Sequence, residues 1–120
     1  MPARNDTLKD HLSRAREIAI RVTGRKTGLV TSRPVWFVLE DNTVYLLPVE
    51  GSDTQWYKNV LKNPAIRVGV KSAETELRFT PLTDAKQVAS VVDKFRAKYG
   101  PGDVKKYYSK FDVAVVAQIP

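Results

Sequence analysis

Apolar residues fall at every second position, or in short extended runs, in six stretches of the chain, as expected of β-strands. The pattern predicts strands at residues 18–22, 31–39, 44–47, 66–70, 77–79 and 111–119. Asp41-Asn42 offers a hairpin turn after the second strand, and Ser72-Ala73 offers one after the fourth. Both faces of the last stretch are apolar, as in a central or interface strand. We expect the first three strands to form a meander and the next two to form a hairpin.

Apolar residues recur at helical spacing in three other segments. They are Leu8, Leu12 and Ala15, then Trp56, Tyr57, Val60 and Leu61, and finally Val88, Val91, Val92, Phe95 and Tyr99. Capping boxes are expected at Thr7 with Asp10, at Ser52 with Gln55 and at Asp84 with Gln87. The last two helices should end at Asn63-Pro64 and at Gly100-Pro101-Gly102, and residues 105–110 then resemble a polar turn.

The predicted order is one helix, three strands, a helix, two strands, a helix and one strand. Six mainly antiparallel strands can curl into a small barrel, which removes exposed sheet edges. A chain of 120 residues is short for two separate hydrophobic cores. We therefore predict an α+β fold in one domain, residues 1–120: a six-stranded split β-barrel with flanking helices and a helical N-terminal segment at residues 1–16.

Composition restricts the chemistry that this domain can perform. The chain has no cysteine and a single histidine, His11, so thiolate chemistry is excluded. A histidine-rich metal cluster or a Ser/His/Asp device is not expected either, and we predict no metal site. Redox chemistry would therefore belong to a bound cofactor. No apolar run approaches the roughly 20 residues of a membrane span, so we expect a soluble cytoplasmic protein.

The net charge of +7 favours an anionic partner. One candidate binding segment is the turn Thr23-Gly24-Arg25-Lys26-Thr27-Gly28. Glycines let successive backbone N–H groups converge on one point, and arginine can clamp a phosphate through two donors. The turn is a plausible phosphate cradle, but a solvated basic hairpin turn is the commoner role of such a hexapeptide.

Proline interrupts a strong strand pattern at Arg33-Pro34-Val35-Trp36. Because proline gives no N–H to a sheet, this segment should lie at an edge, at a bulge or where another molecule meets the backbone. Such a kink could form the floor of a site for a ring-shaped ligand. An edge strand protected against aggregation is an equally good explanation.

The segment Pro48-Val49-Glu50-Gly51-Ser52 leads into the predicted helix that carries Trp56, Tyr57 and Asn59. Free N–H groups and the helix dipole would let an anionic group settle beside Gly51 and Ser52. Trp56 and Tyr57 are more often core residues than ligand contacts.

Tyr107-Tyr108 lies in a lysine-flanked stretch before the last strand. A neutral phenol can donate a hydrogen bond or a proton to a substrate oxygen while hydride arrives elsewhere. Packing at an interface or over the barrel is the alternative. His11 is interpreted as a solvated helix residue.

Together these segments resemble the deazaflavin-dependent nitroreductase family, within the wider group of split-barrel flavin and deazaflavin oxidoreductases that includes pyridoxamine-phosphate-oxidase-like proteins. The resemblance covers about residues 17–119. It is carried by Thr-Gly-Arg-Lys-Thr-Gly at 23–28, Pro34-Val35-Trp36-Phe37, Gly51-Ser52, Trp-Tyr-Lys-Asn-Val-Leu at 56–61 and Lys62-Asn63-Pro64.

The resemblance implies that reduced coenzyme F-420, a deazaflavin, is the cofactor, with FMN as an alternative. It implies cofactor contacts from Arg25, Lys26, Thr27, Gly28, Arg33, Pro34, Val35, Trp36, Val49, Gly51, Ser52, Trp56 and Asn59. Lys26 and Thr27 would hold phosphate, and the backbone of residues 34–36 would face the ring. Tyr107 and Tyr108 would lie on the substrate side as the catalytic residues.

Two positions depart from the family's pattern. Thr31 stands where members commonly have an arginine, although Arg33 lies two residues later on the same strand face. Glu50 stands where a lysine usually meets phosphate, and an unpaired carboxylate there would repel an anionic tail. These departures leave FMN, or another pose of the tail, as alternatives.

We therefore predict an oxidoreductase in which reduced deazaflavin passes hydride to a quinone, nitro or enone acceptor. A homodimer is favoured by the last strand, which is apolar on both faces, and by Gly69, which allows close backbone approach. A flavin-binding protein without turnover is an alternative. A basic barrel that binds nucleic acid ranks lower, because the aromatic residues mostly follow core periods. We expect neither nucleic-acid binding nor integral membrane association.

Overall fold

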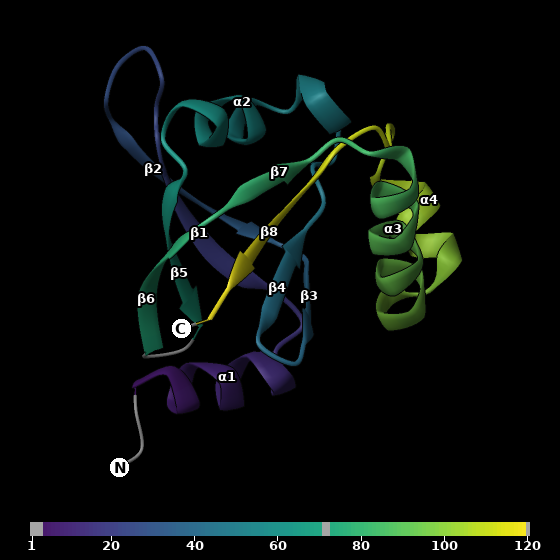
Figure 1. Cartoon of the computed structure of the whole chain (residues 1–120), viewed down its shortest axis with the longest axis horizontal. Helices are drawn as coiled ribbons and strands as arrows, with labels where there is room; N and C mark the ends of the chain where they lie inside the picture. Colours follow the sequence, from purple (N-terminus) through teal and green to yellow (C-terminus); the bar gives the residue numbers. More distant parts are fainter. Residues whose placement is uncertain (1–3, 71–72, 120) are drawn as a thin grey trace.

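The computed structural model describes residues 4–70 and 73–119 (Figure 1). Its strands are β1 (Ile18–Thr23), β2 (Val30–Val35), β3 (Phe37–Glu40), β4 (Thr43–Leu46), β5 (Ala65–Val70), β6 (Ala73–Arg78), β7 (Thr80–Leu82) and β8 (Ala114–Gln118). Its helices are α1 (Arg4–Arg14), α2 (Gln55–Lys62), α3 (Ala85–Tyr99) and α4 (Pro101–Tyr107), with a 3-10 turn η1 (Gly51–Asp53). The strands form two antiparallel four-stranded sheets, ordered β2-β1-β5-β6 and β3-β4-β8-β7. The α+β class is confirmed, but the described residues hold eight strands rather than six.

Two of the predicted strands are divided between the sheets. The predicted strand at residues 31–39 breaks at Trp36, where β2 ends in one sheet and β3 begins in the other. In the same way β6 passes into β7 at Phe79. The chain thus links the sheets along both sides, but among the described residues no closed barrel forms. The predicted meander is also wrong, because β1 pairs with β2 in one sheet and β3 pairs with β4 in the other.

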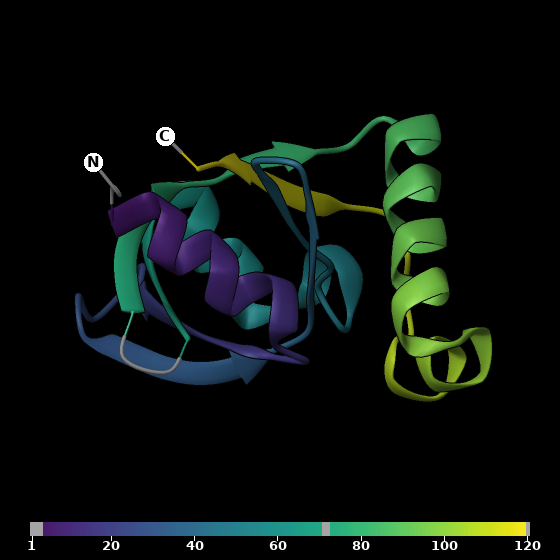
Figure 2. The same ribbon diagram turned by 90° about the horizontal axis from the view of Figure 1, so that it is seen from below.

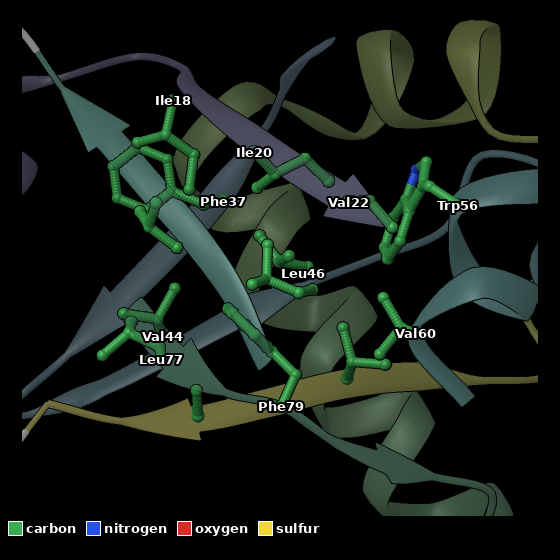
Figure 3. Close-up of a cluster of buried hydrophobic side chains, with 14 of the residues drawn as sticks. Ile18, Ile20, Val22, Phe37, Val44, Leu46, Trp56, Val60, Leu77 and Phe79 are labelled. Carbon is green, nitrogen blue, oxygen red and sulfur yellow. The ribbon is translucent and has the colours of Figure 1, made fainter. Parts of the chain in front are cut away.

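The main core fills the space between the two sheets. Figure 3 shows side chains of β1, such as Ile20, pointing toward Leu46 of β4 and Phe79 at the β6–β7 break. Leu8 and Leu12 of α1 belong to the same cluster, and α1 covers one end of the space between the sheets (Figure 2). Trp56, Tyr57 and Val60 of α2 belong to it too, and α2 lies at the other end in Figure 1. Burying this apolar surface is the main stabilising contribution to the fold.

A second core lies on the outer face of the β3-β4-β8-β7 sheet. It joins Val38 and Ala114 to residues of α3 and α4, among them Phe95 and Val104. β8 lies between β4 and β7, so the prediction of a central final strand is confirmed. Because β8 has a core on each side, the chain itself accounts for the apolar character of both its faces.

The sequence located one of the three predicted helix starts. Asp84 Oδ2 accepts a hydrogen bond from the Gln87 N–H at 3.1 Å, which confirms the cap of α3. The other two are wrong. α1 begins at Arg4, so Thr7 lies inside the helix, and α2 begins after Thr54, with Ser52 in η1.

Three further expectations concern segments around the sheets. The hairpin turn at Asp41-Asn42 is confirmed between β3 and β4, whereas Ser72 lies outside the described residues. The predicted polar turn is wrong in its first part, because α4 continues to Tyr107. Leu61, expected on the buried face of its helix, is 53% exposed. In the described part of the chain, no helix has the length and hydropathy needed to cross a membrane.

Candidate functional site

A cavity of about 610 Å³ opens beside the break between β2 and β3. Its lining residues are Glu17, Arg33, Pro34, Val35, Trp36, Leu47, Val49, Glu50, Thr54, Gln55, Trp56, Tyr107 and Tyr108. They come from the chain just before β1, from β2 and the break after it, from the loop between β4 and α2 with the start of α2, and from the end of α4. Small-molecule sites typically measure about 300–1,000 Å³, so the cavity has the size of a ligand site.

β2 supplies one wall of this cavity because it is an edge strand. The predicted edge position of Pro34 is confirmed, since β2 pairs only with β1 among the described strands. Arg33 lies opposite Ile20 and Val35 lies opposite Ile18, so both point to the face of the sheet that carries the core. At the edge, this face is open to the cavity and not filled by core side chains.

Trp36 is the centre of an aromatic cluster beside the cavity. Its ring lies parallel to that of Tyr99, with centroids 4.2 Å apart and planes at 6°. Tyr107 meets Trp36 edge-on at 5.5 Å, and the Tyr108 ring lies 6.1 Å away. Trp56, which is 4% exposed, belongs to the main core and also lines the cavity. This part of the cavity wall is therefore apolar and aromatic, and residues of both cores hold it in place.

Tyr99 fixes the strand break that carries Trp36. Its hydroxyl oxygen lies 2.6 Å from the Arg16 carbonyl and 2.8 Å from the Phe37 carbonyl, the two acceptors within reach of its single proton, and it accepts from the Phe37 N–H at 3.1 Å. Burial raises the pKa of Tyr99 to about 12. The phenol thus stays protonated at neutral pH, and it ties the chain before β1 to the start of β3.

Replacing Tyr99 with phenylalanine is expected to destabilise the protein by about 1–3 kcal/mol, because the buried Phe37 N–H loses its partner. The Trp36 stack should survive, since the ring remains. Chemical denaturation measures the free energy of unfolding, and near-ultraviolet circular dichroism follows the tryptophan environment. An unchanged midpoint of unfolding would contradict the anchoring role.

Lys98 lies beside the same strand break. Its ammonium donates to the Phe37 carbonyl at 2.9 Å and lies 3.6 Å from the centroid of the Phe37 ring. Burial, with a smaller contribution from the charge of Arg16, lowers the pKa of Lys98 to about 8.

This lowered pKa of Lys98 makes a testable contribution to pH dependence. Between pH 8 and pH 10 the unfolded chain binds more protons at Lys98 than the folded chain, so the contribution of Lys98 to stability rises with pH. Replacing Lys98 with methionine should reduce the slope of unfolding free energy against pH in this window. Denaturation at pH 7, 8, 9 and 10 measures it, and equal slopes would contradict the assignment.

Tyr107 and Tyr108 both line the cavity, but in different settings. Tyr107 is 51% exposed, whereas Tyr108 is 6% exposed and packs in the second core. Burial, helped by Tyr99, raises the pKa of Tyr108 well above its ordinary value, so its hydroxyl remains a donor. The segment after Tyr108 is tied to the cavity's far wall, because the Ser109 N–H donates to the Val49 carbonyl at 2.9 Å.

The basic turn at residues 23–28 lies next to α2, at the edge of the cavity lining. The Arg25 guanidinium donates to Asn59 Oδ1 at 2.8 Å and to Gln55 Oε1 at 3.0 Å, and its backbone N–H also donates to Asn59 Oδ1. Lys26, Thr27 and Gly28 are exposed, and none of the three lines the cavity. Arg25 and Asn59 therefore join the turn to α2.

Ser52, next to Gly51, holds a carboxylate of the chain itself. Asp112 Oδ1 accepts from the Ser52 N–H at 2.9 Å, and Oδ2 accepts from the Ser52 hydroxyl at 2.5 Å. Lys110 lies 3.6 Å from the same carboxylate and 3.2 Å from Asp53. The hydrogen bond from Ser52 lowers the pKa of Asp112. At this point, where an anionic tail was expected, the structure places a side chain.

Four cavity residues were not anticipated from the sequence: Glu17, Leu47, Thr54 and Gln55. No local pattern marks them, because they meet only when the strand order brings β1, β4 and α2 together. Of these four, only Gln55 could have been found from the sequence, because it lies in the first turn of the helix that carries Trp56.

The residues predicted to face the ring lie together in the cavity, whereas those predicted to hold the phosphorylated tail do not line it. The predicted ring contacts Pro34, Val35 and Trp36 line one space with Trp56, beside Val49 and both tyrosines. The donors predicted to take the tail are instead bonded within the chain or exposed on the basic turn. Ring and tail must therefore be considered separately.

Solved structures share this fold at low sequence identity. A structure described as an F420-H2 dependent reductase (FDR-A) is 18% identical, with a TM-score of 0.66, over 86% of this chain and 94% of that one. HutZ, described as a heme storage protein from Vibrio cholerae, is 11% identical, with a TM-score of 0.69, over 95% and 87%. A putative pyridoxamine 5'-phosphate oxidase from Listeria innocua is 14% identical, with a TM-score of 0.65, over 97% and 92%.

These proteins are described with different functions, so their likeness shows a split-barrel-like fold and not an activity. The sequence itself matches a family model over residues 9–116, nearly the whole chain. That model is DUF2255, described as "Uncharacterized protein conserved in bacteria", and the chain belongs to this family.

Proposed function

We propose that the chain binds a flavin-type tricyclic ring in this cavity and uses it for two-electron reduction of a small acceptor. The observation that carries the proposal is the cavity itself, in which the edge backbone of Pro34–Trp36 meets Trp56, Tyr107 and Tyr108. A flat edge strand and aromatic side chains suit a planar ring. The F420-H2 dependent reductase of the same fold supports this choice.

Reduced coenzyme F-420 is the donor that the sequence resemblance implies, and FMN is its alternative. When bound, the reduced ring supplies a hydride, which is one proton and two electrons. The acceptor is a quinone, nitro compound or enone. A quinone that receives hydride also needs a proton to become a hydroquinone.

The chain's own residues would position the ring, exclude water and deliver the proton. Val35 and Trp36 form the wall beside the ring, and Trp36 is held there by its stack on Tyr99. The hydroxyl of Tyr108 is the proton donor in this proposal, because Tyr108 lines the cavity and its phenol stays protonated. Tyr107, at the exposed mouth, would contact the acceptor.

The test is a fluorescence titration of the purified protein with lumiflavin, which is the bare ring, and with riboflavin, FMN and F-420 in both redox states. At least one should bind tighter than about 100 μM. Menadione reduction by the reduced complex then tests turnover. If no ring compound binds below this limit, the proposed function is wrong, and if rings bind without turnover, the protein is a flavin carrier.

Replacing Trp36 with alanine should weaken lumiflavin binding about tenfold, because the ring loses one aromatic wall. Trp36→Phe is the matched control and should retain most of the affinity. Titration by fluorescence quenching measures both variants, after denaturation has shown that each is folded. Equal affinity of a folded Trp36→Ala variant would place the ring elsewhere.

We also propose a homodimer, but on grounds other than those that the sequence offered. The apolar faces of β8 are covered within the chain. The turn before β2 and the start of β2 are open, with Leu29 68% and Val30 62% exposed. A second copy on this edge would cover apolar surface. Light scattering after gel filtration tests it.

A further inference from the structure

The cavity's charged lining is unfavourable for a phosphate. Among the described residues that line it, Glu17 and Glu50 are carboxylates and Arg33 is the only cation, which gives a formal charge of −1. Like charges in a partly enclosed space repel more strongly than in bulk water. A phosphate dianion placed there would face two carboxylates with one guanidinium to offset them.

Donors around the loop between β4 and α2 are already bonded within the chain. The Ser52 N–H and hydroxyl hold Asp112, and Lys110 pairs with Asp53 and Asp112. The carboxylate of Asp112 therefore occupies donors that a phosphate could otherwise use.

The Arg25 guanidinium is used in the same way. The guanidinium donates to the side-chain oxygens of Asn59 and Gln55, and the Lys62 ammonium donates to the backbone carbonyl of Arg25 at 3.2 Å. Turning the Arg25 side chain toward a ligand would break both hydrogen bonds from its guanidinium to α2. An anionic ligand would therefore compete with hydrogen bonds that the fold already makes.

We propose that this cavity selects a flavin-type ring whose side chain carries hydroxyl groups and no phosphate. The proposal rests on the function proposed above and specifies the ligand class. Hydroxyl groups donate hydrogen bonds, and the carboxylates of Glu17 and Glu50 accept them, so the same lining that repels phosphate favours a polyol. Riboflavin has this chemistry. FMN differs from it by one phosphate, and F-420 carries an anionic tail.

The experiment compares lumiflavin, riboflavin and FMN by fluorescence titration at low and high salt. Riboflavin should bind at least about tenfold tighter than FMN at low ionic strength. FMN affinity should increase with added salt, because salt screens the repulsion, whereas lumiflavin affinity should change little. Salt would weaken FMN binding instead if cations held its phosphate.

A pair of charge-reversing variants tests which carboxylate is responsible. Glu50→Lys should increase FMN affinity relative to lumiflavin affinity about tenfold or more. Glu76→Lys is the matched control, because Glu76 lies exposed on β6, does not line this cavity and undergoes the same change of charge. The control should leave the ratio of FMN to riboflavin affinity unaltered.

The possible outcomes separate this inference from the proposed function. FMN or F-420 binding as tightly as riboflavin, or FMN binding that weakens with salt, would overturn the inference while leaving the ring site intact. An equal response of Glu50→Lys and Glu76→Lys would also overturn it, because the repulsion would then not be local. Failure of every ring compound, lumiflavin included, would overturn the proposed function.

Discussion

Replacing Tyr108 with phenylalanine is expected to lower kcat for menadione reduction about 100-fold, the lower end of the usual effect of a general acid. Tyr108 lines the cavity, and burial raises the pKa of its phenol, so the hydroxyl remains protonated in the wild-type protein. Phenylalanine keeps the ring and its packing against Phe95, whose centroid lies 6.0 Å away. The affinity for lumiflavin should therefore change less than about threefold. Stopped-flow kinetics and fluorescence titration measure the two effects separately.

Tyr107→Phe is the matched control for this variant. Tyr107 lines the same cavity but is 51% exposed, so water can replace its hydroxyl as a proton source. Its loss should lower kcat by less than about tenfold. If both variants retain wild-type kcat, neither tyrosine donates the proton and a water molecule does so. If Tyr107→Phe has the larger effect, the assignment within the pair is reversed.

The sequence predicted much of the fold because most of the signals are local. Alternation located β1 and β5, and helical spacing with Asp84 located α3. The sequence did not reveal that the strand around Trp36 passes from one sheet to the other. An extended backbone gives the same alternation of side chains whether it lies in one sheet or in two. The stacking of Trp36 on Tyr99, 63 residues later in the sequence, fixes this break, and no local pattern predicts such a contact.

The candidate site shows the same difference between local signals, which the sequence carries, and long-range contacts, which it does not. Pro34 signalled an open edge strand from its chemistry alone, and the aromatic residues signalled a lining surface. The residue that holds Ser52, however, is Asp112, 60 positions away, and it satisfies the donors that an isolated segment leaves free. Arg25 likewise looks like a free cation in the sequence but bonds to Gln55 and Asn59 in the fold. Motifs locate candidate donors, and only tertiary contacts show whether they are available.

Gly51→Ala is expected to destabilise the protein by about 3 kcal/mol, for two separable reasons. Gly51 has a φ of +57°, which side-chain-bearing residues adopt at a cost of about 1–2 kcal/mol. A Cβ at this position would also overlap Asp112 Oδ1 and lie 2.9 Å from Lys110 Cγ. The carboxylate would have to leave Ser52, and a hydrogen bond to a charged group contributes about 1.5–3 kcal/mol, less where water reaches it. Urea denaturation measures the change in unfolding free energy.

Substitutions at two other glycines separate the cost of the backbone conformation from the cost of the clash with Asp112. Gly28 has a φ of +74° with nothing within 4 Å of a built Cβ, so Gly28→Ala should cost only the conformational part, about 1–2 kcal/mol. Gly102 lies within α4 with open space around it, so Gly102→Ala should stabilise the protein by about 0.5–1 kcal/mol. Equal costs for Gly51→Ala and Gly28→Ala would mean that Asp112 moves away from Ser52 without loss. The donors beside Gly51 would then be available to an anionic ligand, and the preference for an uncharged tail would lose part of its basis.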